Sequence, residues 1–225
     1  MTKVLFLIGS PRGKKSTSFS FGKYLEDKLQ EKGLDTSTLI VRTQLASDEK
    51  IQQMMNEIND SNVIILTTPL YGDCQPYIII KLMELIAAKN MNLEEKRFIP
   101  IINSGLPESA QITAAAIPIY HKFAEIVGLK WAGSLAVEAG EMFKGRWGKQ
   151  MHDLGKEADI MRGILDNLAD AVISETDLPE MAPRVLPGMF YWKILKKPIT
   201  KINTRHWRKV AKEKGEDADA RPYLD

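Results

Sequence analysis

The sequence predicts an α/β fold in which a parallel sheet lies between two layers of helices. Over the first 137 residues, short apolar runs alternate with longer segments whose apolar residues recur every three or four positions. That alternation is typical of parallel strands joined by crossover helices. The runs 4–8 and 63–67 are almost continuously apolar, as in strands covered on both faces. The composition, 44% apolar and 27% charged in 225 residues, suits one large domain with an appendage.

Five strands and four intervening helices predict a doubly wound, three-layer sandwich with the first strand in the centre of the sheet. The strands are expected at 4–8, 38–41, 63–67, 98–103 and 131–137. The helices are expected at 16–32 with Gly33 as the cap, at 51–58, from Pro76 to Ile86, and at 109–127 with a break near Pro118. Because proline cannot donate to a ladder, we place Pro100 at the start of its strand or at a bulge.

The sheet pattern stops after residue 137. Apolar residues at steps of three and four predict one long helix over 147–172 that packs back on the sheet. Pro179, Pro183 and Pro187 then mark an extended linker. We therefore expect a body over residues 1–175 and a linker with a C-terminal arm over residues 176–225.

Charge is distributed unevenly between these two parts. The net charge is +2, but residues 188–215 hold nine Lys and Arg against Glu213 alone, which makes that stretch +8 and the rest of the chain −6. Aromatic residues, among them Trp192 and Trp207, are interleaved with the basic ones, and Pro198 divides the stretch. The sequence favours an arm packed on its own body or on a partner subunit; a membrane surface is the second interpretation and a nucleic acid the third.

Cysteine and histidine usage limits the chemistry. Cys74 is the single cysteine, so no internal disulfide and no cysteine-ligated iron–sulfur cluster can form. The three histidines show no metal-ligand spacing and are interpreted as structural. Redox chemistry would therefore need a bound cofactor. The apolar runs are far shorter than the roughly 18 residues that span a bilayer, and without a secretory signal pattern the expected location is cytoplasmic.

The first strand is followed by a candidate phosphate-binding loop. In open parallel sheets, ligands bind beyond the carboxyl ends of the strands. Here hydroxyl groups, a guanidinium and the start of a helix come together, all of which suit an anion; the residues are Ser10, Arg12, Ser16, Thr17 and Ser18. The loop matches neither the dinucleotide fingerprint nor the nucleotide-hydrolysing motif. The alternative is a solvated turn with a serine helix cap.

Two further loops follow the third and fourth predicted strands. Pro69, Leu70, Tyr71 and Gly72 form a turn that could bring backbone N–H groups and an aromatic ring to a planar ligand. The fourth strand is followed by Asn103, Ser104 and Gly105, which could hydrogen-bond a polar ring edge. The alternative interpretation of Tyr71 is an ordinary aromatic residue at the edge of a cleft. The alternative for Asn103, Ser104 and Gly105 is a turn that ends the strand.

With these three loops the sequence resembles the flavodoxin-like NAD(P)H-dependent oxidoreductases, a superfamily that includes FMN and quinone reductases. The resemblance covers residues 1 to about 140 and implies the strand order 2-1-3-4-5. It implies that the loop from Gly9 to Ser18 holds the phosphate of FMN. The loop from Thr68 to Gly72 would then lie along the isoalloxazine ring, and the loop from Asn103 to Glu108 on its pyrimidine side.

The resemblance implies an FMN-dependent oxidoreductase in which NAD(P)H reduces the flavin and the flavin reduces free flavin, a quinone or another small acceptor. No catalytic side chain is expected, because the cofactors carry the chemistry. The resemblance also implies a homodimer, and no nucleic-acid partner is expected. Two alternatives remain open: an electron-transfer flavoprotein without nicotinamide activity, and a flavin sensor. Cys74 lies in the ring loop, where it is either redox-active or a small packing residue.

Overall fold

This computed structural model describes residues 2–72, 74–89, 91, 93–105, 112–138, 140–143, 150–179, 201, 204–205 and 208–215. The chain divides into two compact units, Met1–Val185 and Leu186–Asp225. This division falls ten residues after the boundary expected at 175/176. Thr176 and Leu178, which follow the expected boundary, form hydrogen bonds with the body.

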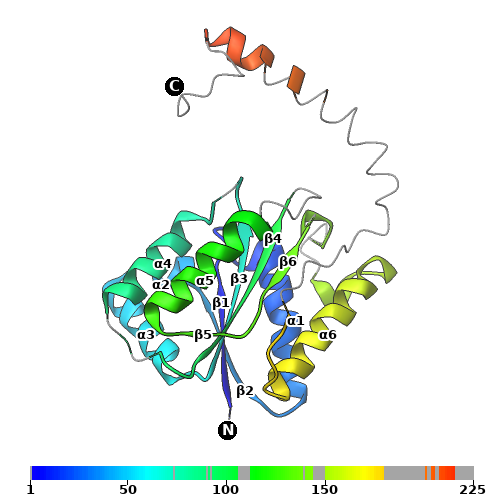
Figure 1. The fold of residues 1–225 in the computed structure, drawn as a ribbon. Helices are drawn as coiled ribbons and strands as arrows, with labels where there is room; N and C mark the ends of the chain where they lie inside the picture. Colours follow the sequence, from blue (N-terminus) through cyan, green and yellow to red (C-terminus); the bar gives the residue numbers. More distant parts are fainter. Residues whose placement is uncertain are drawn as a thin grey trace. The chain divides into compact units, whose positions relative to one another are not determined.

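The body is built on a parallel sheet of strand order β2-β1-β3-β4-β5, as expected (Figure 1). The central strand β1 (Lys3–Ile8) pairs with β2 (Asp35–Ile40) on one side and with β3 (Val63–Leu70) on the other. β4 (Arg97–Ser104) pairs with β3 and, on its outer side, with β5 (Lys130–Trp131) and then β6 (Leu135–Val137). The single fifth strand expected over 131–137 is thus divided into two pieces.

Two layers of helices cover the sheet (Figure 1). One face is covered by α1 (Thr17–Glu31) and α6 (Asp159–Ile173), which share a buried apolar cluster with the sheet. The other face is covered by α2 (Val41–Gln44), α3 (Asp48–Asp60), α4 (Tyr77–Ala88) and α5 (Ile117–Val127), around a second cluster. Burial on both faces explains why β1 and β3 are almost entirely apolar in sequence.

The helix ends follow local sequence signals. Ser16 and Ser47 cap α1 and α3, each accepting a hydrogen bond on its hydroxyl oxygen from the amide three residues later. Gly33 and Gly128 follow α1 and α5 with φ of +83° and +79°, a conformation that glycine adopts without strain. Pro118 lies in the first turn of α5, where its missing N–H costs no helical bond. A π-helical turn over Ile112–Ala116 precedes it, at the break that the sequence predicted.

The long helix expected over 147–172 is wrong in its first part. Residues 147–149 lie outside the described residues, and α6 begins at Asp159, after two single 3-10 turns at Met151–Asp153 and Lys156–Ala158. Arg162 explains the interruption, because its guanidinium donates to the carbonyl oxygens of Met151, Leu154 and Gly155 at 2.8 to 3.1 Å. These carbonyls therefore accept from a side chain, although the carbonyl of Gly155 also accepts from the amide of Ala158 at 3.1 Å in the second 3-10 turn.

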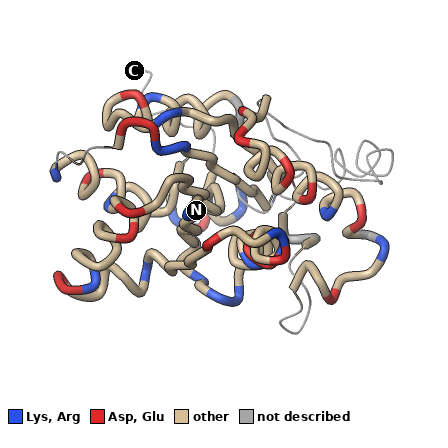
Figure 2. Tube along the Cα trace, turned by 90° about the horizontal axis from the view of Figure 1, so that it is seen from below, with Lys and Arg blue, Asp and Glu red and all other residues tan. Residues whose placement is uncertain are grey.

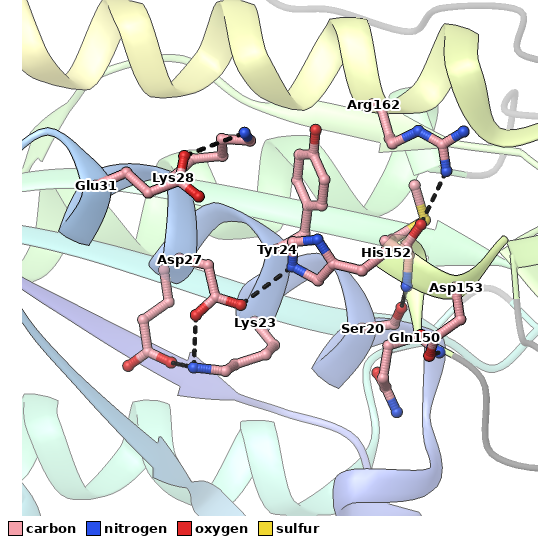
Figure 3. Close-up of polar contacts among 12 residues, drawn as sticks. Ser20, Lys23, Tyr24, Asp27, Lys28, Glu31, Gln150, His152, Asp153 and Arg162 are labelled. Atoms are coloured by element: carbon pink, nitrogen blue, oxygen red, sulfur yellow. Dashed lines mark hydrogen bonds and ion pairs between the residues drawn. The ribbon is translucent and has the colours of Figure 1, made fainter.

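The segment that contains the first of these turns is fastened to α1 (Figure 3). The amide of Met151 donates to the hydroxyl oxygen of Ser20 at 2.7 Å, and His152 Nε2 lies 3.0 Å from a carboxylate oxygen of Asp27. The His152 ring also packs against the ring of Tyr24, with centroids 4.9 Å apart and the ring planes tilted by 37°. Tyr24 in turn donates to Asp166 of α6 at 2.9 Å, and burial raises its pKa to about 12. The phenol therefore remains a proton donor at neutral pH.

Pro100 occupies a position that the sequence did not predict. It lies in the middle of β4, opposite Leu66 of β3, and not at a strand start or bulge. The interruption is instead in the neighbouring strand, between Trp131 and Leu135. The next donor to the carbonyl of Ala132 in a regular parallel ladder would be the amide of residue 100, which proline lacks. The amide of Leu178 supplies that bond at 3.0 Å.

Charged residues of both signs are interspersed over the described helices of the body, as the view from the amino-terminal ends of the strands shows (Figure 2). Mixed charge on the outer surface is typical of a globular domain. Within the described ranges, no helix has the length and apolar character needed to span a membrane.

The close approach of Gly133 to Leu178 predicts a position-specific effect on stability. Gly133 has φ +100°, and a Cβ there would lie 2.3 Å from the carbonyl oxygen of Leu178. We expect Gly133→Ala to lower the free energy of unfolding by about 2 kcal/mol or more, from backbone strain and steric overlap. Urea unfolding followed by circular dichroism measures the change.

Gly163 provides the matched control. It lies within α6, and a Cβ there would meet no atom within 4 Å. Gly163→Ala should raise the free energy of unfolding by roughly 0.5 to 1 kcal/mol, because alanine loses less conformational entropy in a helix. Equal effects of the two substitutions would contradict the packing of Leu178 against Gly133.

Candidate functional site

The three predicted loops meet at one edge of the sheet. β1, β3 and β4 are parallel neighbours, with Ile8 paired to Thr67 and Leu70 paired to Ser104, so their carboxyl ends lie together. The third strand is longer than expected, since β3 runs to Leu70. Pro69 and Leu70 are therefore strand residues and not loop residues, which corrects the expectation that Pro69 forms the turn. Pro69 pairs with Asn103 at the end of the sheet.

The loop after β1 is held close to the end of β3. The amide of Gly9 donates to the carbonyl of Thr67 at 2.7 Å, and a Cβ on Gly9 would lie 2.5 Å from the Ile79 side chain. The loop then turns within itself, with the amide of Gly13 donating to the carbonyl of Ser10 at 3.0 Å. Ser10 is buried and Arg12 is exposed. The loop thus has an internally bonded backbone and an exposed arginine, Arg12.

The hydroxyl groups of Ser16, Thr17 and Ser18 differ in whether they donate or accept hydrogen bonds. Ser16 donates to the carbonyl of Gly13 at 2.6 Å while accepting from the amide of Phe19 at 3.1 Å. Thr17 donates to the carbonyl of Gly140 at 3.0 Å. Ser18 differs, because its oxygen accepts from the side-chain amide of Asn103 at 2.9 Å and its own hydrogen is not committed by that bond. Of the three hydroxyl groups, that of Ser18 can therefore still donate its hydrogen to another acceptor.

This difference could not be predicted from the sequence, where the three residues look equivalent. The hydroxyl of Ser16 serves the helix cap, and that of Thr17 serves the turn at Gly140. The amide of Phe19 is used by the Ser16 cap, so the other candidate donors are the two preceding amides of α1, those of Thr17 and Ser18, since the first amides of a helix lack intrahelical acceptors. Together with the positive end of the helix dipole, they favour an anion at this point.

The side chain of Asn103 connects β4 with α1 and β3. Its side-chain amide donates to the Ser18 oxygen and, at 3.0 Å, to the carbonyl of Thr68. It thereby joins β4 to α1 and to β3. The turn at Gly140–Phe143 packs against the Asn103 side chain. A Cβ on Gly140 would lie 2.9 Å from the side-chain carbonyl oxygen of Asn103. With both amide hydrogens used, the group of Asn103 that can still form a hydrogen bond to a ligand is its carbonyl oxygen.

The loop after β3 is a tight turn with an exposed aromatic ring. Tyr71 and Cys74 form a pair of backbone hydrogen bonds at 3.0 and 3.3 Å, and Gly72 between them has φ +63°. The Tyr71 side chain is 49% exposed and the nearby Tyr77, at the start of α4, is 72% exposed. Such exposure is unusual for large aromatic residues and leaves ring surface available for stacking. Cys74 is also exposed.

The loop after β4 is described only at its beginning. Ser104 ends the strand and is buried, and Gly105 is exposed. Residues 106–111 lie outside the described residues, so the remainder of the loop that was predicted to lie beside the pyrimidine ring is not placed. Ser104 and Gly105 stay predicted ligand contacts.

A neutral phenol lies beneath the site. Tyr120 of α5 is fully buried beside Thr68, and burial raises the pKa of its hydroxyl well above the usual value. This hydroxyl therefore stays protonated across the physiological range and cannot act as a base. Its position supports the end of β3, from which the Tyr71 turn begins.

Two elements of the site were missed by the sequence analysis. The first is the turn at Gly140–Phe143, which lies against Thr17 through the bond described above and against Phe21 through the ring of Phe143, 5.8 Å between centroids. The second is Arg42 in α2, whose Nη2 would lie 3.9 Å from a Cβ on Gly13. Neither had a sequence signal, since both approach the loop from distant parts of the chain. Within the described ranges, no group of three or more His, Cys, Asp and Glu could hold a metal ion.

Comparison with known structures finds the same architecture elsewhere. The structure superposes on an NADH:FMN oxidoreductase with a TM-score of 0.59 at 13% identity, covering 78% of this chain and 90% of that one. The flavodoxin of Streptococcus pneumoniae matches with a TM-score of 0.54 at 16% identity over 78% of this chain and all of the flavodoxin. An FMN-dependent NADH-azoreductase from Bacillus anthracis, in complex with FMN, matches at 0.52 and 12% identity over 76% of this chain and 99% of that one.

The chain has a flavodoxin-like fold. Its structural neighbours comprise quinone reductases, azoreductases and FMN oxidoreductases as well as flavodoxins, all at low sequence identity. No family model matches the sequence, and no curated protein matches it. The likeness confirms the predicted fold.

The position of Asn103 predicts a large effect of its removal. Asn103→Ala would leave the carbonyl of Thr68 and the hydroxyl of Ser18 without their partner in a buried setting. We expect a loss of about 2 to 3 kcal/mol in the free energy of unfolding. Asn56→Ala is the control, because Asn56 is exposed on α3 and its side chain accepts a hydrogen bond from the nearby Gln52. Denaturant unfolding of both variants measures the difference, and similar small losses would refute the cross-linking role.

Proposed function

We propose that the chain is an FMN-dependent NAD(P)H oxidoreductase that reduces a small acceptor such as a free flavin, a quinone or a related molecule. The observation that carries the proposal is the convergence of three loops at one sheet edge, joined through Asn103. This edge is where open α/β sheets bind ligands. Structural neighbours that are described as FMN-dependent or as NADH:FMN oxidoreductases support the same ligand.

The donors of the first loop suit the phosphate of FMN. The start of α1 offers backbone N–H groups and a favourable dipole, Ser18 has an uncommitted hydroxyl hydrogen, and the exposed Arg12 can add a two-pronged contact. Ser10 orders the turn, because its hydroxyl oxygen accepts from the amide of Arg12 at 3.3 Å. In this proposal Ser16 and Thr17 act mainly by shaping the loop, because their hydrogens are committed to Gly13 and Gly140.

The remaining loops suit the ring system. FMN, when bound, supplies an isoalloxazine ring that accepts a hydride and passes electrons on. The exposed ring of Tyr71 offers a stacking surface, and the turn at Gly72 brings backbone close to it. The Asn103 carbonyl oxygen can accept from an N–H at a polar ring edge. No side chain of the described site is needed as an acid or base, in keeping with hydride transfer between cofactors.

The visible spectrum tests the cofactor and the reaction together. We expect the purified protein, or the protein after addition of FMN and gel filtration, to show flavin absorbance that NADH or NADPH bleaches rapidly under anaerobic conditions. A protein that retains FMN but does not bleach would instead support the electron-carrier or sensor alternatives. Failure to retain any flavin would refute the proposal.

The phosphate contact has its own test. Arg12→Ala should weaken FMN binding roughly tenfold to a hundredfold through loss of a charge-assisted hydrogen bond. Riboflavin, which lacks the phosphate, should bind both proteins equally. Lys122→Ala is the control, since Lys122 is exposed on α5 and pairs with Glu125. Flavin fluorescence titration measures the affinities, and a parallel loss for riboflavin would contradict the assignment. Ser16→Ala is a poor substitute, because losing the helix cap costs about 1 kcal/mol of stability.

A further inference from the structure

The turn after β3 carries a nucleophilic group that the proposed reaction does not use. Cys74 is the single cysteine of the chain, and its side chain is exposed. Its backbone forms two hydrogen bonds with that of Tyr71, which hold it in an ordered turn just before α4. Oxidation of a cysteine depends on access to its sulfur. Small reagents in solution can therefore reach this thiol.

Gln75 presents an unused hydrogen-bond donor beside the thiol. The residue is buried, with 5% of its surface exposed. The Cys74 thiol donates to Gln75 Oε1 at 3.9 Å, which places the end of the Gln75 side chain at the sulfur. Within the described part of the chain, the other atom of that amide group, Nε2, is buried and has no hydrogen-bond partner. Because a buried donor without an acceptor costs free energy, this amide favours a form of Cys74 that carries an acceptor.

The phenol of Tyr120 is electrostatically coupled to the same thiol. Tyr120 is fully buried, and among the described residues its hydroxyl has no hydrogen-bond partner. Burial raises the pKa of this hydroxyl most, and the nearby Cys74 adds to the rise. The phenol is therefore neutral at physiological pH and does not repel a negative charge on the sulfur.

Addition of one oxygen atom to the sulfur supplies the acceptor that Nε2 lacks. A cysteine sulfenic acid has an oxygen that accepts a hydrogen bond and a hydrogen that can be donated to a carbonyl oxygen. The side-chain amide of Gln75 offers both complementary groups. A mixed disulfide would place a second sulfur there instead, and sulfur is a weak acceptor. The surroundings of Cys74 therefore fit the sulfenic acid better than the disulfide.

The cysteine content determines what happens to such a product. A sulfenic acid ordinarily condenses with a neighbouring thiol to form a disulfide. No second cysteine is present in this sequence, so condensation within one chain is excluded. A sulfenic acid at Cys74 therefore persists until an external thiol or a second oxidant reaches it.

We infer that Cys74 is an oxidation site for hydroperoxides, at which the side-chain amide of Gln75 stabilises the sulfenic acid that forms. The sulfur attacks one peroxide oxygen, so that an S–O bond forms and the O–O bond breaks. The sulfur loses two electrons, and the departing oxygen takes the thiol proton and leaves as water, or as an alcohol from an organic hydroperoxide. A small thiol then attacks the sulfur, releases water and gives a mixed disulfide, which a second thiol reduces. No step uses a flavin, so the inference does not rest on the proposed function.

Trapping with dimedone, which reacts with sulfenic acids, tests the inference. The full chain, with and without FMN, is treated with a small excess of hydrogen peroxide, and dimedone is added after increasing delays. We expect mass spectrometry to find an adduct at Cys74 that is still trapped after minutes, and no adduct in Cys74→Ser. Dithiothreitol added before dimedone should prevent the adduct, because thiols reduce the sulfenic acid. Absence of the adduct, or an oxidised product that dithiothreitol does not reverse, would overturn the inference.

Gln75→Met tests the role of the amide separately from that of the thiol. Methionine has a similar length but no N–H donor, so the lifetime of the sulfenic acid should fall roughly fivefold to tenfold, the effect of one hydrogen bond. Gln53→Met is the matched control, because Gln53 is exposed on α3, and it should behave like the wild type. Equal lifetimes in Gln75→Met and the wild type, or an equal loss in the control, would contradict the assignment.

Alkylation by iodoacetamide distinguishes stabilisation from access. This reaction needs an accessible thiol but adds no oxygen to the sulfur for Nε2 of Gln75 to bind. We therefore expect similar alkylation rates of Cys74 in Gln75→Met and in the wild type, with circular dichroism verifying that both are folded. A change in alkylation rate as large as the change in sulfenic acid lifetime would assign the effect to access and overturn the role of Gln75.

Discussion

The two hydrogen bonds donated by the side-chain amide of Asn103 are the interaction on which the candidate site depends. They connect the end of β4 with Ser18 in α1 and with the carbonyl of Thr68 in β3. Each of these segments adjoins one of the three candidate ligand loops. Because the amide is buried, neither bond is exchanged for water without cost. The relative position of the three loops is therefore set by one residue whose own hydrogens are fully used.

This arrangement also assigns different tasks to neighbouring polar groups. Ser16 and Thr17 donate their hydroxyl hydrogens to backbone carbonyls and so stabilise the loop. The Ser18 oxygen accepts a hydrogen bond from Asn103, which leaves the Ser18 hydrogen available. On the other face of the sheet, the buried phenol of Tyr120 remains neutral beside Thr68 of β3. The site thus combines a rigid polar base with an exposed rim that contains Arg12 and Tyr71. A rigid base of this kind reduces the ordering that a ligand must impose when it binds.

At the outer part of the sheet, the missing N–H of Pro100 in β4 affects the neighbouring strand. Pro100 cannot donate to β5, so the ladder is interrupted between β5 and β6, and the chain after α6 fills the gap through the amide of Leu178. Arg97 reinforces this contact by donating to the carbonyl of Thr176. The sequence showed that Pro100 would disturb a strand. It did not show that the disturbance would appear in the neighbouring strand and be repaired by a segment 78 residues further along.

The sequence by itself determined the alternation of strands and helices, their order, the glycine that ends the first helix, Gly33, and the loops in which a ligand site should lie. These features depend on periodicity, on residue types and on parallel topology, all of which are local or nearly so. Only the tertiary structure decided which hydroxyl keeps its hydrogen, that Asn103 joins three segments, that Gly140 and Arg42 approach the loop, and that Arg162 delays the start of α6. Each of these depends on groups that are distant in sequence and adjacent in space, so no local pattern records them.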